Sequence, residues 1–378
     1  MKLMYVAPHL SNVGGLERTL TNKANYMVEQ GHDVRLLTYA EHQTKIFYPL
    51  HPNVGVISLG TPFHQLFHYP AYARLWYYFH IRRNFRNKMR QAVSDFQPDV
   101  VVITIPNTED FIYDIVSAAG HAKVVIESHL AADYHLVNLS STEKVIYRFY
   151  PPLEAIKKAD LLITLTEKDA ESWRKRGVKN VVTVPNPIPR NCHSKSQTEK
   201  LPGRIIAVGR LDEQKRHDRL IEAFALIADK HPSWYIDLFG KGQLYDDLMA
   251  QIQQSGLDGR INILDPVKDI FSEYWRSQFF VLSSDYEGFS LVIVEAMACG
   301  IPVVSTNCPC GPAEIINDGV TGLLAQLNAA DLAEKMDWMI THESERRLMG
   351  EKSLLRVSDF AEEKVMVKWI NAYKSVLA

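Results

Sequence analysis

The 378-residue chain has few cysteines and no long hydrophobic run. Its cysteines do not stand at the spacings of a disulfide framework: Cys192, Cys299, Cys308 and Cys310. No second Cys or His pair lies at zinc-site spacing from the last two, so we expect no metal site. The longest apolar run, residues 100–105, is far shorter than the ~20 residues that span a bilayer. Residues 1–8 are too short an apolar run for a signal peptide, so we expect a cytoplasmic protein or one peripheral to the cytosolic face of a membrane.

Acidic residues are absent between Glu41 and Asp95, although the whole chain has a formal net charge of only −2. Basic and apolar residues of this stretch share a helical pattern: Arg74, Arg82, Arg83, Arg86, Lys88 and Arg90, with Leu75, Tyr78, Ile81, Phe85 and Met89. One interpretation is a cationic amphipathic helix within residues 63–90 that binds an anionic membrane surface. The other is an ordinary surface helix that packs on a sheet through the same apolar stripe.

Several motifs that would point to other chemistry are also missing. The chain has no Walker loop, no nucleophile elbow and no Asp-x-Asp element at the end of a predicted strand. Its slightly acidic balance argues against nucleic acid as a partner. We therefore expect no cofactor and no metal–diphosphate site.

Short apolar runs alternate with helical patterns in both halves of the chain. The predicted strands are residues 2–7, 33–38, 99–104, 124–127, 161–165 and 181–184, then 205–208, 235–239, 261–264, 279–282 and 303–305. Helices are predicted at 16–30, 216–230, 244–254 and 291–298. Continuous apolar strands between helices indicate parallel sheets covered on both faces. Because the polar, Pro-rich segment 186–203 separates the halves, we predict an α/β fold with two doubly wound, Rossmann-like domains, 1–190 and 203–360, facing a cleft.

Residues 283–297 contain two glutamates, Glu287 and Glu295, around the point where a predicted strand gives way to a helix. The residues at this junction would present backbone amides to a phosphate: Gly288, Phe289, Ser290 and Leu291. Along one helix the two carboxylates would stand about 12 Å apart, at ~1.5 Å per residue. They could then hold two separate hydroxyl-bearing parts of one ligand.

Two further motifs follow the first predicted strand of each half. Arg210 and Lys215 could stabilise a diphosphate leaving group, or they could be two surface cations on a loop. Gly14 and Gly15 could form a tight turn at positive φ, or could also allow a phosphate to approach the backbone.

Together these motifs resemble those of the retaining GT-B glycosyltransferases, the group 1 family that includes bacterial glycogen synthase, sucrose synthase and lipid mannosyltransferases. The glutamate segment is similar to the family's E-x7-E element, and Val13-Gly-Gly-Leu-Glu-Arg18 to its N-terminal glycine loop. Residues 207–215 resemble its phosphate clamp, and residues 184–188 its Pro-Asn stretch before the linker. The resemblance covers most of the chain.

The resemblance implies a role for individual residues. Glu287 would position the donor sugar, Glu295 would hold the ribose hydroxyls, and Arg210 and Lys215 would replace a metal ion at the diphosphate. His129, at the end of a predicted strand, would contact the transferred sugar, although leucine follows it where the family usually has glycine. A helix in residues 361–378 would cross back to the N-terminal domain.

The activity implied by the resemblance is metal-independent transfer with retention of configuration. A hexosyl or N-acetylhexosaminyl unit would pass from a nucleoside diphosphate sugar, with a UDP-sugar favoured, to a hydroxyl of a glycan or lipid-linked oligosaccharide, forming an α-linkage. Two alternatives stay open. One is a nucleotide-sugar epimerase of the same fold, and the other is a nucleotide-sugar-binding module without activity.

Overall fold

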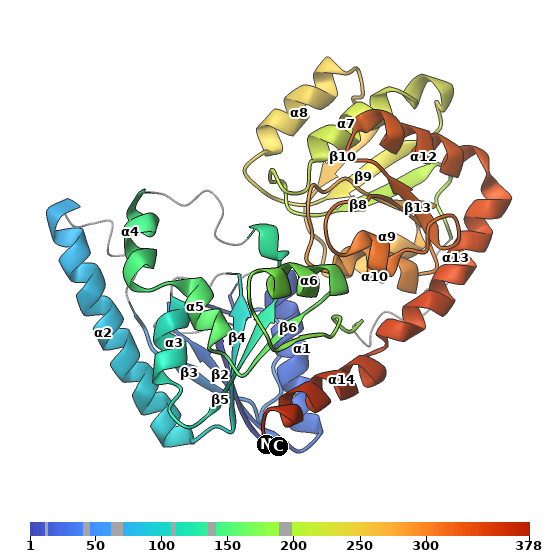
Figure 1. Cartoon of the computed structure of the whole chain (residues 1–378). Coiled ribbons are helices and arrows are strands. Elements are labelled where there is room, and N and C mark those ends of the chain that lie inside the picture. Colours follow the sequence, from blue (N-terminus) through green and yellow to red (C-terminus); the bar gives the residue numbers. More distant parts are fainter. Residues whose placement is uncertain (12–13, 41–45, 62–70, 107–110, 135–140, 189–198) are drawn as a thin grey trace. The chain divides into compact units, whose positions relative to one another are not determined.

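The computed structural model describes the chain apart from residues 12–13, 41–45, 62–70, 107–110, 135–140 and 189–198, and apart from the side chains of residues 71–75 and 141–143. The chain divides into two compact units (Figure 1). The first comprises Met1–Pro185 together with the C-terminal Met366–Ala378, and the second comprises Asn186–Val365. Each unit contains a parallel sheet of its own.

The first unit is built on a seven-stranded sheet in the order β3-β2-β1-β4-β5-β6-β7. Its strands are β1 Lys2–Ala7, β2 Asp33–Thr38, β3 Gly55–Ser58, β4 Val100–Ile105, β5 Lys123–Ser128, β6 Leu161–Thr164 and β7 Val181–Thr183. Every residue of the central strand β4 is buried, as expected for a β-branched strand covered on both faces. The edge strand β3 is absent from the predicted set because its residues alternate between half-buried and exposed.

Helices between and after the strands complete this unit. They are α1 Gly15–Glu29, α2 Ala71–Phe96, α3 Ile112–Ala118, η3 Ala132–Tyr134, α4 Ser141–Phe149, α5 Pro152–Lys157 and α6 Glu167–Lys175. Helix α14, Glu362–Ser375, begins in the second unit and ends in the first (Figure 1). The largest buried side chain of the core, Trp173, donates a hydrogen bond from Nε1 to Ser128 Oγ at 3.3 Å, where β5 ends.

The helix predicted in the acid-free stretch is present as α2, but part of its basic face lies inside the unit. Three apolar positions of its stripe are buried, Ile81, Phe85 and Met89, while Tyr78 is half-buried. Arg82 is fully buried as well, forms an ion pair with buried Asp114 of α3 and lies 3.9 Å from the ring centroid of Tyr150. Arg86 contacts the same carboxylate at 2.5 Å. The assignment of these two arginines to a membrane-facing surface is therefore wrong, because a buried carboxylate holds both.

The second unit is built on a six-stranded sheet in the order β10-β9-β8-β11-β12-β13. Its strands are β8 Arg204–Val208, β9 Tyr235–Phe239, β10 Ile261–Leu264, β11 Phe279–Leu282, β12 Val303–Thr306 and β13 Gly322–Ala325. Its helices are α7 His217–Ala225, η5 Ala228–Lys230, α8 Tyr245–Gln254, α9 Ile270–Trp275, α10 Leu291–Ala298, α11 Pro312–Ile315, α12 Ala329–Thr341, α13 Glu343–Val357 and η6 Ser358–Phe360. The predicted helix 216–230 is thus divided into α7 and η5.

The strand order of this sheet reverses between β8 and β11, which are direct neighbours. Ligands of doubly wound sheets bind at the carboxyl ends of such a strand pair. The predicted fold class, with two doubly wound parallel sheets, is confirmed. Among the described helices, none combines the length and apolar character that a membrane crossing requires.

Candidate active site

Two loops meet at the strand reversal of the second unit. The cationic loop, residues 209–216, follows β8, and the glutamate loop, residues 283–290, follows β11. Lys215 of the first loop and Glu287 of the second form an ion pair with 2.6 Å between Nζ and Oε1. Ser284 Oγ donates to the same carboxylate oxygen at 2.6 Å. Because both charged side chains are nearly buried, the pair is held in one geometry by its surroundings.

Further hydrogen bonds and an ion pair hold the two loops together. The residues that form these contacts were not predicted from the sequence. The Asp285 amide donates to the Gln214 carbonyl at 2.9 Å, and Gln214 Nε2 donates to the Tyr286 carbonyl at 2.9 Å. Arg219 of α7 reaches across to the Ser283 carbonyl at 2.8 Å and to the Asp285 carboxylate at 2.5 Å. The position of Lys215 against Glu287 therefore depends on a network that extends into α7.

Arg210 differs from Lys215 in its exposure. Its side chain is 69% exposed, and its ion pair and side-chain hydrogen bond within the described residues lie in its own loop, with 3.1 Å to Asp212 and 2.9 Å to Gln214. Sequence analysis treats the two cations as one clamp, but the structure gives them different environments. Both cations have a carboxylate partner, but Lys215 is nearly buried with Glu287, whereas Arg210 extends into solvent and is accessible to an anionic ligand.

The glutamate loop ends at the N-terminus of α10. Ser290, the residue before the helix, has φ 59° and ψ 72°, a left-handed conformation that is rare outside glycine. Its buried Oγ has no hydrogen-bond partner among the described residues, and neither do the backbone amides of Gly288, Phe289 and Ser290. These groups, with the positive end of the helix dipole, suit an anion or a sugar hydroxyl.

Only Glu295 lies on α10, because the helix begins at Leu291. The distance of about 12 Å along one helix is therefore not the right measure for the two glutamates. Glu295 is 2% exposed and accepts a hydrogen bond from the hydroxyl of buried Tyr274 at 3.4 Å. The Tyr274 hydroxyl thus compensates part of the cost of burying this carboxylate.

The loop after β12 packs against the glutamate loop and contains Cys308 and Cys310, both buried. The Glu287 amide donates to the carbonyl of Pro309 at 3.3 Å. Burial and the neighbouring Glu287 raise the pKa of the Cys308 thiol. A thiol with a raised pKa is a poor metal ligand and nucleophile, so this loop acts as packing; Cys192 lies outside the described residues.

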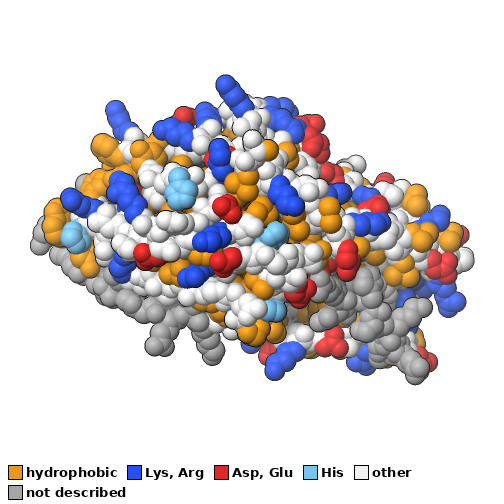
Figure 2. Space-filling model, turned by 90° about the horizontal axis from the view of Figure 1, so that it is seen from below, with side chains coloured by type: hydrophobic (Ala, Val, Ile, Leu, Met, Phe, Trp, Pro, Cys, Tyr) orange, Lys and Arg blue, Asp and Glu red, His pale blue; other side chains and the backbone are white. Residues whose placement is uncertain are grey.

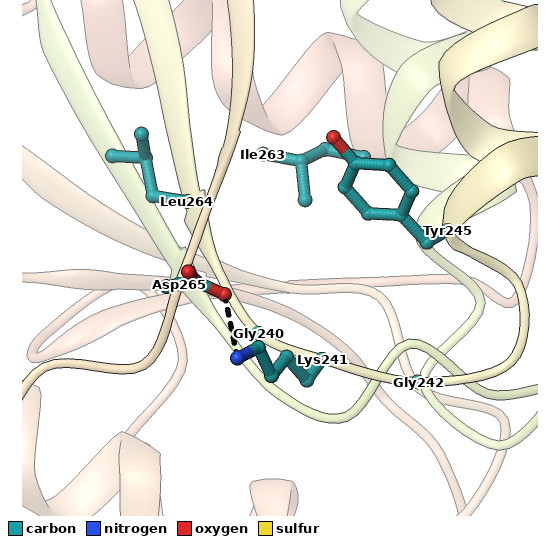
Figure 3. Close-up of a pocket in the computed structure, with 7 residues that line it drawn as sticks. All are labelled: Gly240, Lys241, Gly242, Tyr245, Ile263, Leu264 and Asp265. Atoms are coloured by element: carbon teal, nitrogen blue, oxygen red, sulfur yellow. Dashed lines mark ion pairs between the residues drawn. The ribbon is translucent and has the colours of Figure 1, made fainter.

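A cavity of about 400 Å³ opens at the carboxyl ends of β9 and β10. It is lined by Gly240, Lys241, Gly242, Tyr245, Ile263, Leu264 and Asp265 (Figure 3). The two glycines are required by close packing, since a Cβ atom on Gly240 would lie 2.0 Å from the Gly209 carbonyl oxygen. The Leu211 amide donates to the Lys241 carbonyl at 2.9 Å, so the cavity adjoins the cationic loop. Sequence reasoning missed this cavity, although a Gly-Lys-Gly turn directly after a buried strand was visible.

The remaining predicted residues lie in the first unit. His129 follows β5, and its Nε2 lies 3.1 Å from Glu127 Oε2. Glu127 is also paired with Lys23 of α1, with 2.6 Å between Nζ and Oε1. Burial raises the pKa of Glu127, but Lys23 and His129 outweigh it and lower this pKa to about 2. Burial lowers the pKa of His129 against the opposing effect of Glu127, so the ring is neutral at pH 7.

Gly14 and Gly15 stand where α1 begins, with Gly14 as the N-cap. The expected positive φ is not found, because Gly14 has φ −125° and ψ 158°. A Cβ atom at Gly14 would lie 2.2 Å from Glu17 Oε2, so a larger residue would displace the end of this flexible side chain. Glu17, in the first turn of α1, is only 8% exposed.

Comparison with known proteins identifies relatives whose sequences align with nearly the whole chain. A protein described as an uncharacterized glycosyltransferase from Haemophilus influenzae is 25% identical over 373 residues, covering 97% of this chain and 98% of the relative. A Campylobacter jejuni enzyme is 25% identical over 387 residues, covering 100% of this chain and 99% of the relative. Its name gives an alpha-1,4-N-acetyl-D-galactosaminyltransferase acting on a GalNAc-containing saccharide linked to PP-undecaprenol.

Solved structures share the fold at lower identity. The crystal structure of TarM superposes with a TM-score of 0.80 at 15% identity, covering 98% of both chains. The structure of Anabaena HepE in complex with UDP has a TM-score of 0.74 at 18% identity, covering 99% of this chain and 100% of that one. A family model described as "Glycosyl transferases group 1" matches residues 190–356, and one described as "Glycosyltransferase Family 4" matches residues 13–191. With these two models spanning both units, the chain belongs to the group 1 glycosyltransferases, and its two Rossmann-like sheets form the GT-B fold.

Proposed function

We propose that this glycosyltransferase moves a hexosyl or N-acetylhexosaminyl unit from a UDP-sugar to a hydroxyl of a lipid-linked or polysaccharide acceptor. Transfer would retain the donor's α configuration and need no metal ion. The observation that carries the proposal is the arrangement at the strand reversal of the second sheet. There, an exposed arginine, a paired lysine and the N-terminus of α10 follow two adjacent strands.

Cleavage of the bond between sugar and diphosphate leaves negative charge on the diphosphate. Arg210 can approach this group with a planar fork of donors, and Lys215 adds a fixed point charge. Interactions that strengthen as the charge develops lower the barrier, so these cations accelerate transfer more than they tighten binding. Glu287, held by Lys215 and Ser284, would accept hydrogen bonds from hydroxyls of the donor sugar.

The cavity beside the cationic loop supports the nucleotide assignment. Its volume of about 400 Å³ lies within the range of small-molecule sites, ~300–1,000 Å³. The Tyr245 ring and the Ile263 side chain offer flat apolar surface, and Asp265 and Lys241 offer polar groups at the rim (Figure 3). We assign this cavity to the base. Glu295, deeper in the same unit, would contact the ribose.

The acceptor assignment draws on the relatives and on one exposed surface of the first unit. The Campylobacter enzyme, by its name, acts on an undecaprenol-linked saccharide. Helices α2 and α4 expose Trp76, Phe79 and Phe149, and the rings of the last two lie 6.5 Å apart. Exposed basic residues accompany them: Arg83, Arg90, Lys144 and Arg148. Aromatic side chains beside cations suit the interface of an anionic bilayer, so this surface would dock on the membrane that holds the acceptor.

Basic and hydrophobic side chains also occur together elsewhere, so the docking test needs a control. On the face shown in Figure 2, basic and acidic side chains are both scattered among hydrophobic ones. Trp76→Ser with Phe149→Ser should reduce sedimentation with vesicles containing phosphatidylglycerol, while transfer to a short soluble acceptor continues. Leu355→Ser, at a residue 75% exposed in the second unit, is the matched control. Vesicle binding that is absent in the wild type, or insensitive to lipid charge, refutes the docking surface.

Transfer itself is tested with a panel of nucleotide sugars and a saccharide acceptor in the presence of EDTA. The proposal expects product only when acceptor is present, with an anomeric coupling constant of an α-linkage in the NMR spectrum. An epimerase would convert the nucleotide sugar without acceptor, and a binding module would bind it without turnover. A β-linked product would exclude retention.

A further inference from the structure

Next to His129, the first unit contains a buried network of charged and hydroxyl groups that extends to the C-terminal helix α14. Lys23 of α1 and Glu127 of β5 are both completely buried and form an ion pair. The hydroxyl of Tyr373, on α14, donates a hydrogen bond to Glu127 Oε1. Residues separated by more than 200 positions in sequence thus meet on one carboxylate.

Lys23 and Glu127 are both charged, and the groups around them explain why. Glu127 is contacted by the Lys23 ammonium, the Tyr373 hydroxyl and the His129 ring, which compensate for the water it has lost. The Lys23 ammonium also lies 3.1 Å from the ring centroid of Trp369, another residue of α14, in a cation–π contact. Burial lowers the pKa of Lys23 to about 8, which still leaves it mostly protonated at pH 7.

An ionised Glu127 determines which nitrogen of His129 carries the proton. A carboxylate only accepts hydrogen bonds, so the ring nitrogen 3.1 Å away, Nε2, must be the one that donates. Nδ1 of the neutral ring is then an acceptor, and it has no partner among the described residues. A sugar hydroxyl can donate to such a nitrogen.

Stability alone does not account for this arrangement. Apolar side chains of similar volume usually stabilise a core as well as a buried ion pair does, because removing both charges from water is costly. The buried pair is therefore explained better by its effect on the histidine that it contacts.

We propose that Glu127, held by Lys23 and Tyr373, is a positioning residue that fixes His129 as the Nε2–H tautomer, with Nδ1 free to accept from a hydroxyl of the transferred sugar. The inference rests on the proposed function, together with the contact between His129 and the transferred sugar that the family resemblance implies. It also assigns the C-terminal helix a part in transfer, since Tyr373 and Trp369 hold the pair that orients the ring.

The tautomer can be measured without any enzymatic assay. Long-range ¹H–¹⁵N correlation spectra of protein labelled with ¹⁵N-histidine distinguish the two neutral forms and the charged form. His129→Asn identifies the signals by their loss. We expect the Nε2–H form in the wild type at pH 7.5, and a mixture of forms in the double variant Lys23→Met, Glu127→Gln. A wild-type His129 in the Nδ1–H or the charged form overturns the proposal.

The double variant is chosen because Glu127→Gln alone leaves a buried ammonium without its partner and can prevent folding. With both charges removed, we expect a melting temperature near that of the wild type. Transfer should nevertheless fall on the order of 10- to 100-fold in kcat, with a smaller change in the KM of the donor. In the His129→Asn background, the same double change should add little further loss. Losses that multiply instead would mean that Glu127 acts independently of His129, and would overturn the proposal.

Two tyrosines provide a matched pair. The Tyr5 hydroxyl donates to the Tyr373 hydroxyl at 3.3 Å, whereas among the described residues it is Tyr373, and not Tyr5, that donates a hydrogen bond to Glu127. Tyr373→Phe should lower kcat, whereas Tyr5→Phe should leave it nearly unchanged; equal effects would contradict the inference. If the wild type transfers no sugar from any donor, the proposed function fails, while the NMR spectra still decide the tautomer.

Discussion

Lys215→Met is the most informative single change, because it alters stability and catalysis by amounts that the structure predicts separately. Methionine keeps much of the side-chain length and removes the charge. Glu287, only 6% exposed, would then keep Ser284 Oγ as its described hydrogen-bond donor. Breaking a buried ion pair costs about 3–5 kcal/mol, and the 13% exposure of Lys215 favours the lower end, about 3 kcal/mol.

The catalytic effect has a different origin. Loss of one preformed charge at a developing anion costs about 10²- to 10³-fold in kcat. Lys215→Met should therefore reduce both the free energy of unfolding and kcat. In the double variant with Glu287→Gln, the unpaired carboxylate is gone, so stability should recover while transfer stays low.

Arg210→Met is the matched control for this reasoning. Its side chain is 69% exposed, so its removal should change the free energy of unfolding by no more than about 0.5 kcal/mol. Transfer should still fall on the order of 10²-fold, since Arg210 is the cation free to approach the phosphates.

Urea unfolding and steady-state transfer with a saturating UDP-sugar measure the two effects on the same preparations. A Lys215→Met enzyme with unchanged kcat would remove the lysine from the proposed mechanism. An Arg210→Met enzyme that loses stability but not activity would reverse the roles of the two cations.

Three further changes test other parts of the structure. Burial, reinforced by Lys215, lowers the pKa of His217 from 6.5 to about 4. Between these pH values the unfolded chain binds more protons than the folded one. The free energy of unfolding should therefore fall by up to about 3 kcal/mol as the pH drops from 6.5 to 4. Urea unfolding should show a smaller fall in His217→Gln. Gly14→Ala should lower the free energy of unfolding, measured by thermal unfolding, by about 1 kcal/mol. The N-cap position disfavours alanine, and the new Cβ atom would displace the Glu17 carboxylate. Arg82→Leu should lower the free energy of unfolding by about 3 kcal/mol, because it leaves buried Asp114 without this partner. Arg83→Leu, at an exposed position, should change it by less than about 0.5 kcal/mol and only weaken vesicle binding.

Much of the sheet architecture could be predicted, because each strand is specified by its own residues. The predicted 235–239, 261–264 and 279–282 coincide with β9, β10 and β11. Strands β3 and β13 are missing from the prediction because each has only four residues and begins with glycine, a residue that is depleted in strands.

The site could be predicted only as far as local sequence determines it. The helix start at Leu291 follows from adjacent residues. The left-handed conformation of Ser290, which is not a glycine, does not. The partner of Arg82, Asp114, stands on another helix, and no periodicity within α2 could reveal it.

Because contacts with remote elements cannot be predicted from local sequence, the positions of catalytic groups are harder to predict than their identities. Motifs indicate that a lysine, a glutamate and a histidine are present, but their geometry is set by partners from remote elements. Arg219 of α7 orients the glutamate loop through Asp285, and Tyr373 of the last helix contacts the carboxylate beside His129. Both partners act by donating hydrogen bonds to a carboxylate, and such bonds to charged groups are stronger and more directional than neutral ones. Conservative changes at these supporting residues should therefore affect transfer more than their distance in sequence from the motifs would suggest.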